Sequence, residues 1–236
     1  MTKATRVLVF TDSHMWCEMA GALIKCYFPE GVEFVRGKKG SVLPKGIGNT
    51  SLELVISFLS PFIIPQSILS NSKMSVNFHP GTSDYPGSGC FNFALYENAT
   101  TYGAVSHHME SKVDTGEIIE EMTFPIFPHD TVESLQFRSY QTLMSLLDNF
   151  LQLYAAGEAI PTAGITWSRK PFTRRMLEKL KTLDPSSNED EFVARFRATN
   201  YPGFPPRIEA YGQTFEVSQS DALPMAFSFK LPPVDD

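Results

Sequence analysis

Short apolar runs, separated by polar loops and one helical segment, mark the first part of the chain. Buried strands are predicted at residues 6–10, 32–35, 52–59 and 74–78, with a helix at residues 16–27. Strands that are apolar on both faces and alternate with helices are typical of parallel sheets covered on both sides. The pattern therefore predicts an α/β fold.

The middle of the chain continues with a short helix, two extended segments and a long helix. We predict the short helix at residues 90–97, a strand of mixed faces at 102–109 and a second extended segment at 116–126. Asp130 and Glu133 have the spacing of a capping box, and the helix that they open carries an apolar stripe from Val132 to Tyr154. That stripe is expected to pack in the core.

After Gly157 the composition of the sequence changes, which predicts a second, smaller region of the chain. Glycine and proline cluster near residues 161–164, and a basic amphipathic stretch follows at 172–183. Ser186 and Glu189 form a capping box for a further short helix, and residues 207–217 alternate like a β-hairpin. We predict a domain over residues 1–165 and a small C-terminal region over residues 166–236.

Composition and charge narrow the classes of function. The 236 residues are 42% hydrophobic and 19% charged, and the net charge of −6 gives no broad basic surface for nucleic acid. The three cysteines show no CxxC spacing, which favours a reducing compartment. The apolar run near the start is too short for a signal peptide, and Glu53, Pro61 and Pro65 interrupt the longest apolar stretch. We expect a soluble cytoplasmic protein without a nucleic-acid or membrane partner.

Asn77 and His79 stand at the end of a predicted strand. Two residues apart on a strand, their side chains share one face, and Pro80 then ends the ladder of hydrogen bonds. The carboxyl edge of a parallel sheet is where ligands bind, and the glycines at 81, 87 and 89 allow tight turns beside it. The same residues also fit a capped strand end with a hydrogen-bonded structural histidine.

Other chemistries have weaker support. Gly87-Ser88-Gly89 lacks the GxSxG spacing of a nucleophile elbow, and Cys90 fits a small buried thiol better than a nucleophile. His107 and His108 are adjacent on a predicted strand, so they point to opposite faces and do not readily chelate one metal. We expect no metal site.

Three segments together resemble the folate-dependent formyltransferases. They are NFHPGTSDYPGSG from Asn77, the strand Gly103-Ala-Val-Ser-His107, and Val113-Asp-Thr-Gly116, within a match over residues 52–126. Two departures are visible, in the loop at residues 81–86 and at Ser106, where the family has Val or Thr. The resemblance implies a Rossmann-like, mostly parallel sheet with helices on both faces, followed by a small helix and hairpin appendage.

The resemblance makes Asn77, His79 and Asp114 the catalytic residues of a formyl transfer from N10-formyltetrahydrofolate to an amine. An asparagine amide can hold the formyl oxygen as negative charge develops on it. His79 can take the proton of the amine or support that oxygen, and Asp114 can orient the imidazole. No metal is implied.

The resemblance also suggests binding residues. The turn at residues 57–64 resembles the segment whose backbone reads the pterin. The implied folate-binding residues are Phe58, Leu59, Ser60, His107 and Asp114. The predicted substrate-binding residues are Thr11, Asp12 and His14 after the first strand, Gly89, Phe91 and Asn92 beside the motif loop, and Arg197, Tyr201 and Phe204 in the tail.

The tail separates the branches of the family. Methionyl-tRNA formyltransferases carry a large basic C-terminal domain, glycinamide ribonucleotide formyltransferases lack the appendage, and formyltetrahydrofolate hydrolases carry an N-terminal regulatory domain. Residues 170–178 and 196–204 resemble the sugar N-formyltransferases, which implies a nucleotide-linked amino dideoxy sugar of surface polysaccharide as substrate, and a homodimer. The alternatives are another small amine, such as a purine precursor or an amino acid, or a folate- or nucleotide-binding module without turnover.

Overall fold

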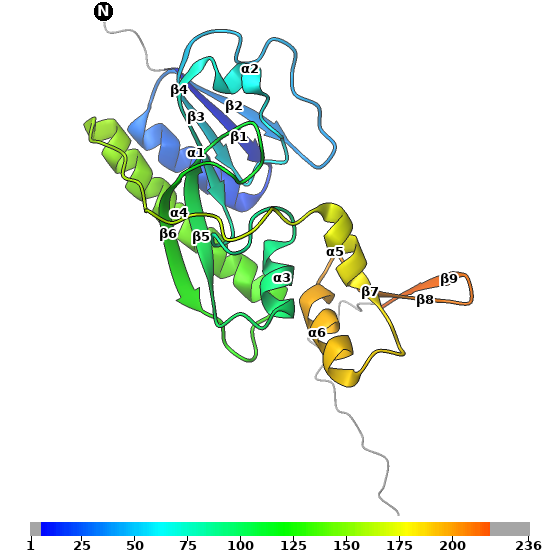
Figure 1. The fold of residues 1–236 in the computed structure, drawn as a ribbon. Helices are drawn as coiled ribbons and strands as arrows, with labels where there is room; N and C mark the ends of the chain where they lie inside the picture. The colour runs from blue at the N-terminus through cyan, green and yellow to red at the C-terminus, as the bar shows by residue number, and fades with distance from the viewer. Residues whose placement is uncertain (1–5, 218–236) are drawn as a thin grey trace, which may run out of the picture.

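A six-stranded sheet forms the centre of the protein. The computed structural model describes residues 6–217, and the sheet has the order β2-β1-β3-β4-β5-β6 (Figure 1). Its strands are β1 (Val7–Asp12), β2 (Val32–Gly37), β3 (Leu52–Phe58), β4 (Ser72–His79), β5 (Thr101–His108) and β6 (Ile118–Pro125). The strands from β2 to β4 pair in parallel, while β5 and β6 pair antiparallel to their neighbours. The predicted mostly parallel α/β sheet is confirmed.

Helices cover both faces of this sheet, as the apolar pattern predicts. The helices of this part are α1 (Met15–Tyr27), α2 (Gln66–Leu69), α3 (Cys90–Tyr96) and α4 (Val132–Ala156). The stripe of α4 packs with α1 against one face, where Phe78 and Phe150 contact each other edge to face. The opposite face, with Leu8 and Phe10, packs against α2. Among the described residues, no helix has the length and apolarity that a membrane crossing needs.

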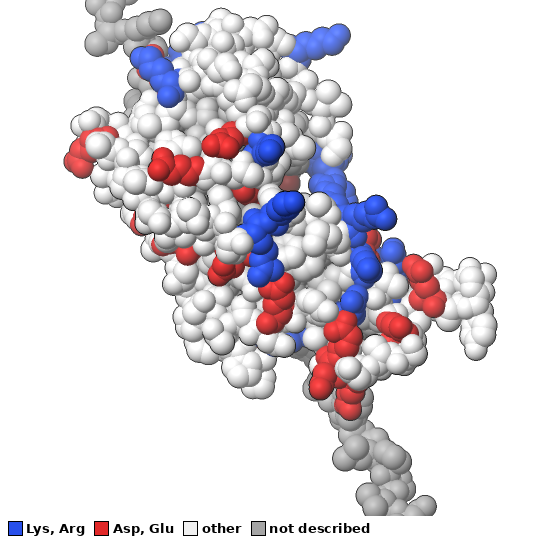
Figure 2. Space-filling view, in the orientation of Figure 1, with Lys and Arg blue, Asp and Glu red and all other residues white. Residues whose placement is uncertain are grey.

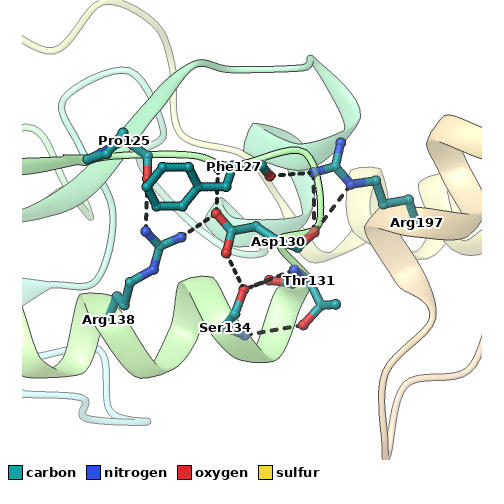
Figure 3. A network of polar contacts seen from close by, with 7 residues as sticks. All are labelled: Pro125, Phe127, Asp130, Thr131, Ser134, Arg138 and Arg197. Carbon is teal, nitrogen blue, oxygen red and sulfur yellow. Dashed lines mark hydrogen bonds and ion pairs between the residues drawn. The ribbon is translucent and has the colours of Figure 1, made fainter. Parts of the chain in front are cut away.

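The start of α4 differs from the prediction by one residue. Thr131, not Asp130, caps the helix: its hydroxyl accepts from the Ser134 amide at 3.3 Å, and the Ser134 hydroxyl accepts from the Thr131 amide at 2.9 Å. The Asp130 carboxylate is occupied elsewhere, by Arg138, the Phe127 amide and the Ser134 hydroxyl (Figure 3). A carboxylate with three partners at one side of the turn is not free to cap.

The C-terminal region is a small helical and β unit beside the main sheet. Its elements are α5 (Arg174–Lys181), β7 (Thr182–Leu183), α6 (Glu189–Thr199), β8 (Arg207–Ala210) and β9 (Gln213–Glu216). The predicted hairpin is confirmed, and its turn places Tyr211 and Gly212 at positive φ. Asn188 caps α6, which corrects the prediction of Ser186, because both the amide and the hydroxyl of Ser186 donate to Asp184.

Polar and aromatic contacts fix this region to the main domain. The Asn92 amide of α3 donates to the Ala198 carbonyl of α6 at 2.6 Å. Arg197 reaches from α6 to the carbonyls of Phe127 and Asp130, at 3.2–3.4 Å (Figure 3). Phe172 stacks on Phe93 with ring centroids 3.8 Å apart. The two parts therefore share one packed interface.

Candidate active site

Four polar side chains meet at the carboxyl end of β4. Asn77 and His79 lie on β4, and His107 on β5 is the direct partner of Asn77 in the antiparallel register. Asp114 comes from the connection between β5 and β6. Asn77 and His79 face the same side because they are two residues apart, while Phe78 points into the core. The structure thus brings together the three residues predicted to be catalytic.

Hydrogen bonding fixes the proton arrangement of His107. Its Nδ1 lies 2.8 Å from the carbonyl of His108, so this nitrogen donates its proton to that oxygen. Its Nε2 lies 3.0 Å from the Asn77 Nδ2 amide, from which it accepts in the neutral ring, and 3.3 Å from Asp114 Oδ1, to which it donates when the ring is protonated. The second proton of that amide points toward Asp114 Oδ1 at 3.4 Å. Consequently Asn77 donates to both neighbours, with its carbonyl oxygen on the other side of the amide.

Asp114 is the electrostatic centre of the site. Its side chain is only 5% exposed, and its oxygens lie 3.4 Å from His79 Nδ1 and 3.3 Å from His107 Nε2. The Gly87 amide donates to Oδ2 at 2.8 Å. Burial by itself raises the pKa of Asp114, but His79, His107 and the Gly87 amide outweigh it and hold the pKa well below the ordinary value of 3.8. Asp114 is therefore a carboxylate under all conditions near neutrality.

His79 lies between two oxygen acceptors. Its Nε2 is 2.9 Å from the Tyr85 carbonyl, and its Nδ1 faces Asp114. Each ring nitrogen thus faces an oxygen atom, and the tautomer decides which nitrogen donates. Gly81 makes room for this ring, because a Cβ there would lie 2.7 Å from Nε2. The arrangement provides a buried imidazole with a carboxylate behind it.

A cavity of about 530 Å³ opens over this cluster. Asn77, His79, His107 and Asp114 line it together with the turn after β3, including the predicted folate-binding residues Leu59 and Ser60. Phe58, predicted with them, is fully buried in the core against Phe78, so its side chain does not reach the cavity. The strand continues through residue 58, and the turn that exposes side chains begins only at Leu59.

The residues predicted after the first strand are placed differently from expectation. Thr11 and Asp12 belong to β1, which runs further than the predicted strand, and the Thr11 side chain is fully buried. His14 caps α1 by accepting from the Trp16 amide at 3.4 Å. The ring of His14 lies edge to face with Tyr140, 5.8 Å between centroids.

Residues at the start of α3 and in the tail serve mainly the packing described above. Gly89 precedes α3 at positive φ, and Phe91 contacts Tyr140 with centroids 6.2 Å apart. Tyr201 stacks on Phe204 at 5.5 Å. The structure therefore gathers His14 and Phe91 around Tyr140. It does not bring Arg197, Tyr201 or Phe204 to the lining of the cavity over His79.

Sequence reasoning missed Trp167 altogether and, for Gly87, predicted the tight turn but not the contact with Asp114. Trp167 lies edge to face with both His79 and His107, and Gly87 supplies the backbone amide that reaches Asp114. Trp167 stands in a segment without periodicity, rich in glycine and proline, so nothing in the pattern indicated its partners. Its one signal was the presence of a large aromatic residue in an otherwise polar connection.

Cys90 is buried beside the site as a thiol. Burial raises the pKa of Cys90 to about 11, and its Sγ lies 3.4 Å from the Pro80 carbonyl. A thiol with this pKa is not a nucleophile near neutrality. Within residues 6–217, no group of three or more His, Cys, Asp or Glu side chains is placed to hold a metal ion.

The fold and the cluster define a doubly wound α/β protein with a buried amide–imidazole–carboxylate site at the carboxyl edge of its sheet. Residues 47–147 match the family model described as formyl transferase, and the four clustered side chains fall within that range. This part of the chain is thus similar to the formyl transferases, as its motifs predict.

The chain is similar to known proteins both in sequence and in structure. In sequence, 110 residues are 28% identical to a methionyl-tRNA formyltransferase from Geobacter sulfurreducens, covering 46% of this chain and 35% of that protein. Phosphoribosylglycinamide formyltransferases, one of them from Dictyostelium discoideum, are also related, with 31% identity over 39% of this chain and 50% of that protein. The chain spans only about a third to a half of the length of these relatives.

In structure, the similarity extends over nearly the whole chain. A sugar N-formyltransferase from Shewanella sp FDAARGOS_354 has a TM-score of 0.74 at 19% identity, over 94% of this chain and 100% of that one. An N-formyltransferase from Helicobacter canadensis, in complex with folinic acid and dTDP-3-aminofucose, has a TM-score of 0.68 at 16% identity, over 88% of this chain and 85% of that one. At these identities the agreement establishes the fold, including that of the C-terminal region.

Proposed function

We propose that the protein is an N-formyltransferase that moves the formyl group of N10-formyltetrahydrofolate to the amine of a nucleotide-linked amino dideoxy sugar. The observation that carries the proposal is the cluster of Asn77, His79 and Asp114, buried at the base of a cavity within the part of the chain that is similar to the formyl transferases. Its amide, imidazole and carboxylate match the needs of this reaction.

The proposed reaction is an acyl transfer through a tetrahedral intermediate. The amine nitrogen attacks the formyl carbon, and the carbonyl electrons move to the formyl oxygen. The Asn77 Nδ2 amide, whose contact with Asp114 is long at 3.4 Å, and the His79 ring share their protons with that oxygen through three-centre hydrogen bonds. The bond from the formyl carbon to N10 then breaks, N10 gains a proton and the amine nitrogen loses one. Asp114 stays ionised throughout because its pKa is low, so its negative charge faces the His79 ring during the transfer.

The proposed folate site is the cavity over the cluster. Leu59, Ser60 and His107 line it with Asp114, and a cavity of about 530 Å³ is within the range of small-molecule sites. The Helicobacter protein was solved with a folate compound, which supports a folate co-substrate here. No residue of this proposal requires a metal.

A sugar acceptor fits this chain better than tRNA. The net charge of −6 is unfavourable for binding a polyanion, although methionyl-tRNA formyltransferases are among its sequence relatives. Structural agreement extends over the full length of a sugar N-formyltransferase. His14 and Phe91, gathered around Tyr140, are the aromatic residues proposed to border the acceptor. In this proposal, the enzyme works in the cytoplasm on precursors of surface polysaccharide.

We also propose that the chain forms a homodimer through the hairpin of β8 and β9. Tyr211 at its tip is fully exposed, and Phe215 is 56% exposed on the edge strand. An exposed edge strand with apolar side chains is suited to pair with a second copy.

The decisive test is an assay with N10-formyltetrahydrofolate and a panel of nucleotide-linked 3-amino and 4-amino dideoxy sugars, read by mass. We expect one sugar to gain a formyl group. In N77A or H79A the rate should fall about 10²–10³-fold, because a donor to the developing oxyanion is lost. His129→Ala, at an exposed histidine, is the matched control and should keep the wild-type rate.

Two results would count against the proposal. Full activity in His79→Ala would remove the catalytic assignment. Transfer to a different amine, such as a purine precursor, with no reaction on any sugar, would keep the reaction class and replace the acceptor.

A further inference from the structure

The segment of residues 161–173, here called the strap, crosses the candidate active site on its way to α5. It is fixed to the site at several points along its length. The Ala163 amide donates to the Ile118 carbonyl at 2.9 Å, and the Ser168 amide donates to the Ser83 carbonyl at 3.2 Å. Further on, the strap pairs with the loop that follows His79. It is thus held as a third wall of the site.

Trp167 is the residue of the strap that turns inward. It is half-buried, whereas Thr166 and Ser168 on either side are exposed. Its indole nitrogen donates to the Gly116 carbonyl at 2.8 Å, which fixes the plane of the ring. Gly116 is closely packed itself, since a Cβ there would lie 1.9 Å from the His108 carbonyl. The indole is therefore anchored to the rigid end of the connection that carries Asp114.

From this anchor the indole contacts both imidazoles. Its ring centroid lies 5.1 Å from that of His107 at an interplanar angle of 89°, and 5.9 Å from that of His79 at 73°. Edge-to-face contacts of this kind are favourable and directional. Both imidazoles also face the Asp114 carboxylate, at 3.3 and 3.4 Å. One side chain thus covers the two rings that share one carboxylate.

The strap also supports the other donor to Asp114. Gly87, whose amide reaches Asp114 at 2.8 Å, forms a β-bridge with Phe172. The Ser88 amide donates to the Phe172 carbonyl at 2.9 Å, and the Phe172 amide to the Pro86 carbonyl at 2.8 Å. A Cβ on Gly87 would lie 2.3 Å from the Phe172 carbonyl, so the approach is as close as glycine permits.

We propose that Trp167 is a positioning residue for formyl transfer: its indole, held by the strap, fixes the orientation of the His79 and His107 rings about Asp114. The expected effect of Trp167 on the rate of formyl transfer rests on the proposed function. The structural consequence, ordered imidazoles with fixed tautomers, stands whatever the acceptor is. In a site of this kind, a misplacement of about 1 Å costs on the order of 10²-fold in rate.

The test compares Trp167→Ala, Trp167→Phe and Ile165→Ala in the full chain. Ile165 lies on the same strap at 40% exposure and serves as the matched control. Two readouts are used: kcat and KM with N10-formyltetrahydrofolate and the accepted amine, and the side-chain nitrogen shifts of the five histidines by long-range ¹H–¹⁵N spectra. His79→Ala and His107→Ala assign the two signals.

We expect Trp167→Ala to lower kcat about 10–100-fold with KM for the amine little changed. The nitrogen shifts of His79 and His107 should move toward values averaged over tautomers. Trp167→Phe, which keeps a ring, should restore most of kcat and the nitrogen shifts, and Ile165→Ala should match the wild type.

The inference is overturned if Trp167→Ala keeps both nitrogen patterns, or if its kcat stays within twofold of the wild type. It is also overturned if Phe restores neither readout while the variant remains folded by circular dichroism. If the wild type transfers no formyl group to any amine, the proposed function fails, and the nitrogen shifts still decide the role of Trp167.

Discussion

Asp114 shows how much local structure one residue of the site requires. Its φ of 48° is in the left-handed region, where aspartate is tolerated better than most residues. Four neighbours then face its carboxylate: the Gly87 amide, Asn77, His79 and His107. Such a carboxylate is stabilised in the folded protein and not in the unfolded chain.

The pH dependence of stability follows from the lowered pKa of Asp114. Because the folded-state value lies below the ordinary 3.8, the stabilisation is fully present above that pH and is lost as the pH falls through the folded-state value. We expect D114N to lower the free energy of unfolding by about 3 kcal/mol at pH 7, since two buried histidines lose their anion. Urea titrations from pH 7 down to pH 3 measure this difference.

The difference between wild type and D114N should shrink below about pH 4, as the wild-type carboxylate is protonated in the unfolded state. Asp190→Asn, at an exposed residue of α6, is the control and should change stability by no more than about 0.5 kcal/mol at any pH. A gap that stays constant down to pH 3 would show that ionisation of Asp114 is not its cause.

At the scale of single residues, a site residue could be predicted where strand alternation or a sequence motif determined its place. Strand alternation places Asn77 and His79 on one face, and the motif around Asp114 identifies its role by resemblance. The Phe58 side chain is buried in the core, which leaves only its backbone for the predicted folate contact, and that contact stays a prediction. Trp167 was missed, since its contacts depend on tertiary structure and the strap has no periodicity.

At the scale of elements, the helix starts show the same limit. The capping boxes were expected at Asp130 and Ser186, and the helices begin after Thr131 and Asn188. The helices themselves were predictable from their apolar stripes. The exact cap was not, because Arg138 and Asp184 engage the expected capping groups in ways that only the folded chain defines.

Arg197 tests whether α6 holds substrate or holds the fold. Its guanidinium donates to the carbonyls of Phe127 and Asp130, at 3.2–3.4 Å (Figure 3). We expect Arg197→Met to lower the free energy of unfolding by about 1–2 kcal/mol, as carbonyls lose charged donors. The KM of the accepted amine should stay unchanged. Urea denaturation and steady-state kinetics measure the two effects.

Arg175→Met, at an exposed arginine of α5, is the matched control for charge. It should leave both stability and KM near wild type. If Arg197→Met raises KM tenfold while stability is unchanged, the predicted role of Arg197 in substrate binding is supported instead.

At the scale of the whole molecule, charge is distributed unevenly. The net charge is −6, yet Lys and Arg side chains gather over α5 and the strap, as Figure 2 shows.

The parallel part of the sheet could be predicted from runs that are apolar on both faces. The antiparallel pairing of β5 and β6 could not, because mixed faces fit either direction. The division of the chain at residue 165 remains a prediction.

The proposed dimer is tested at the hairpin. We expect wild-type protein to have twice the 26.4 kDa mass of one chain by light scattering. Tyr211→Glu combined with Phe215→Glu should shift it to one chain, because charges on the exposed hairpin oppose pairing with a second copy. Val42→Glu, at an exposed loop residue distant in sequence from the hairpin, should leave the mass unchanged. A monomeric wild type would remove the proposal.

The close approach of Gly87 to Phe172 has a consequence for recombination between related chains. A hybrid joined at residue 165 takes Gly87 from one parent and Trp167 and Phe172 from the other. Because a Cβ at residue 87 meets the Phe172 carbonyl at 2.3 Å, a parent without glycine there cannot accept this tail unaltered. Residue 87 and the segment around residue 172 are therefore best inherited together, because a joint between them is tolerated only where residue 87 is glycine.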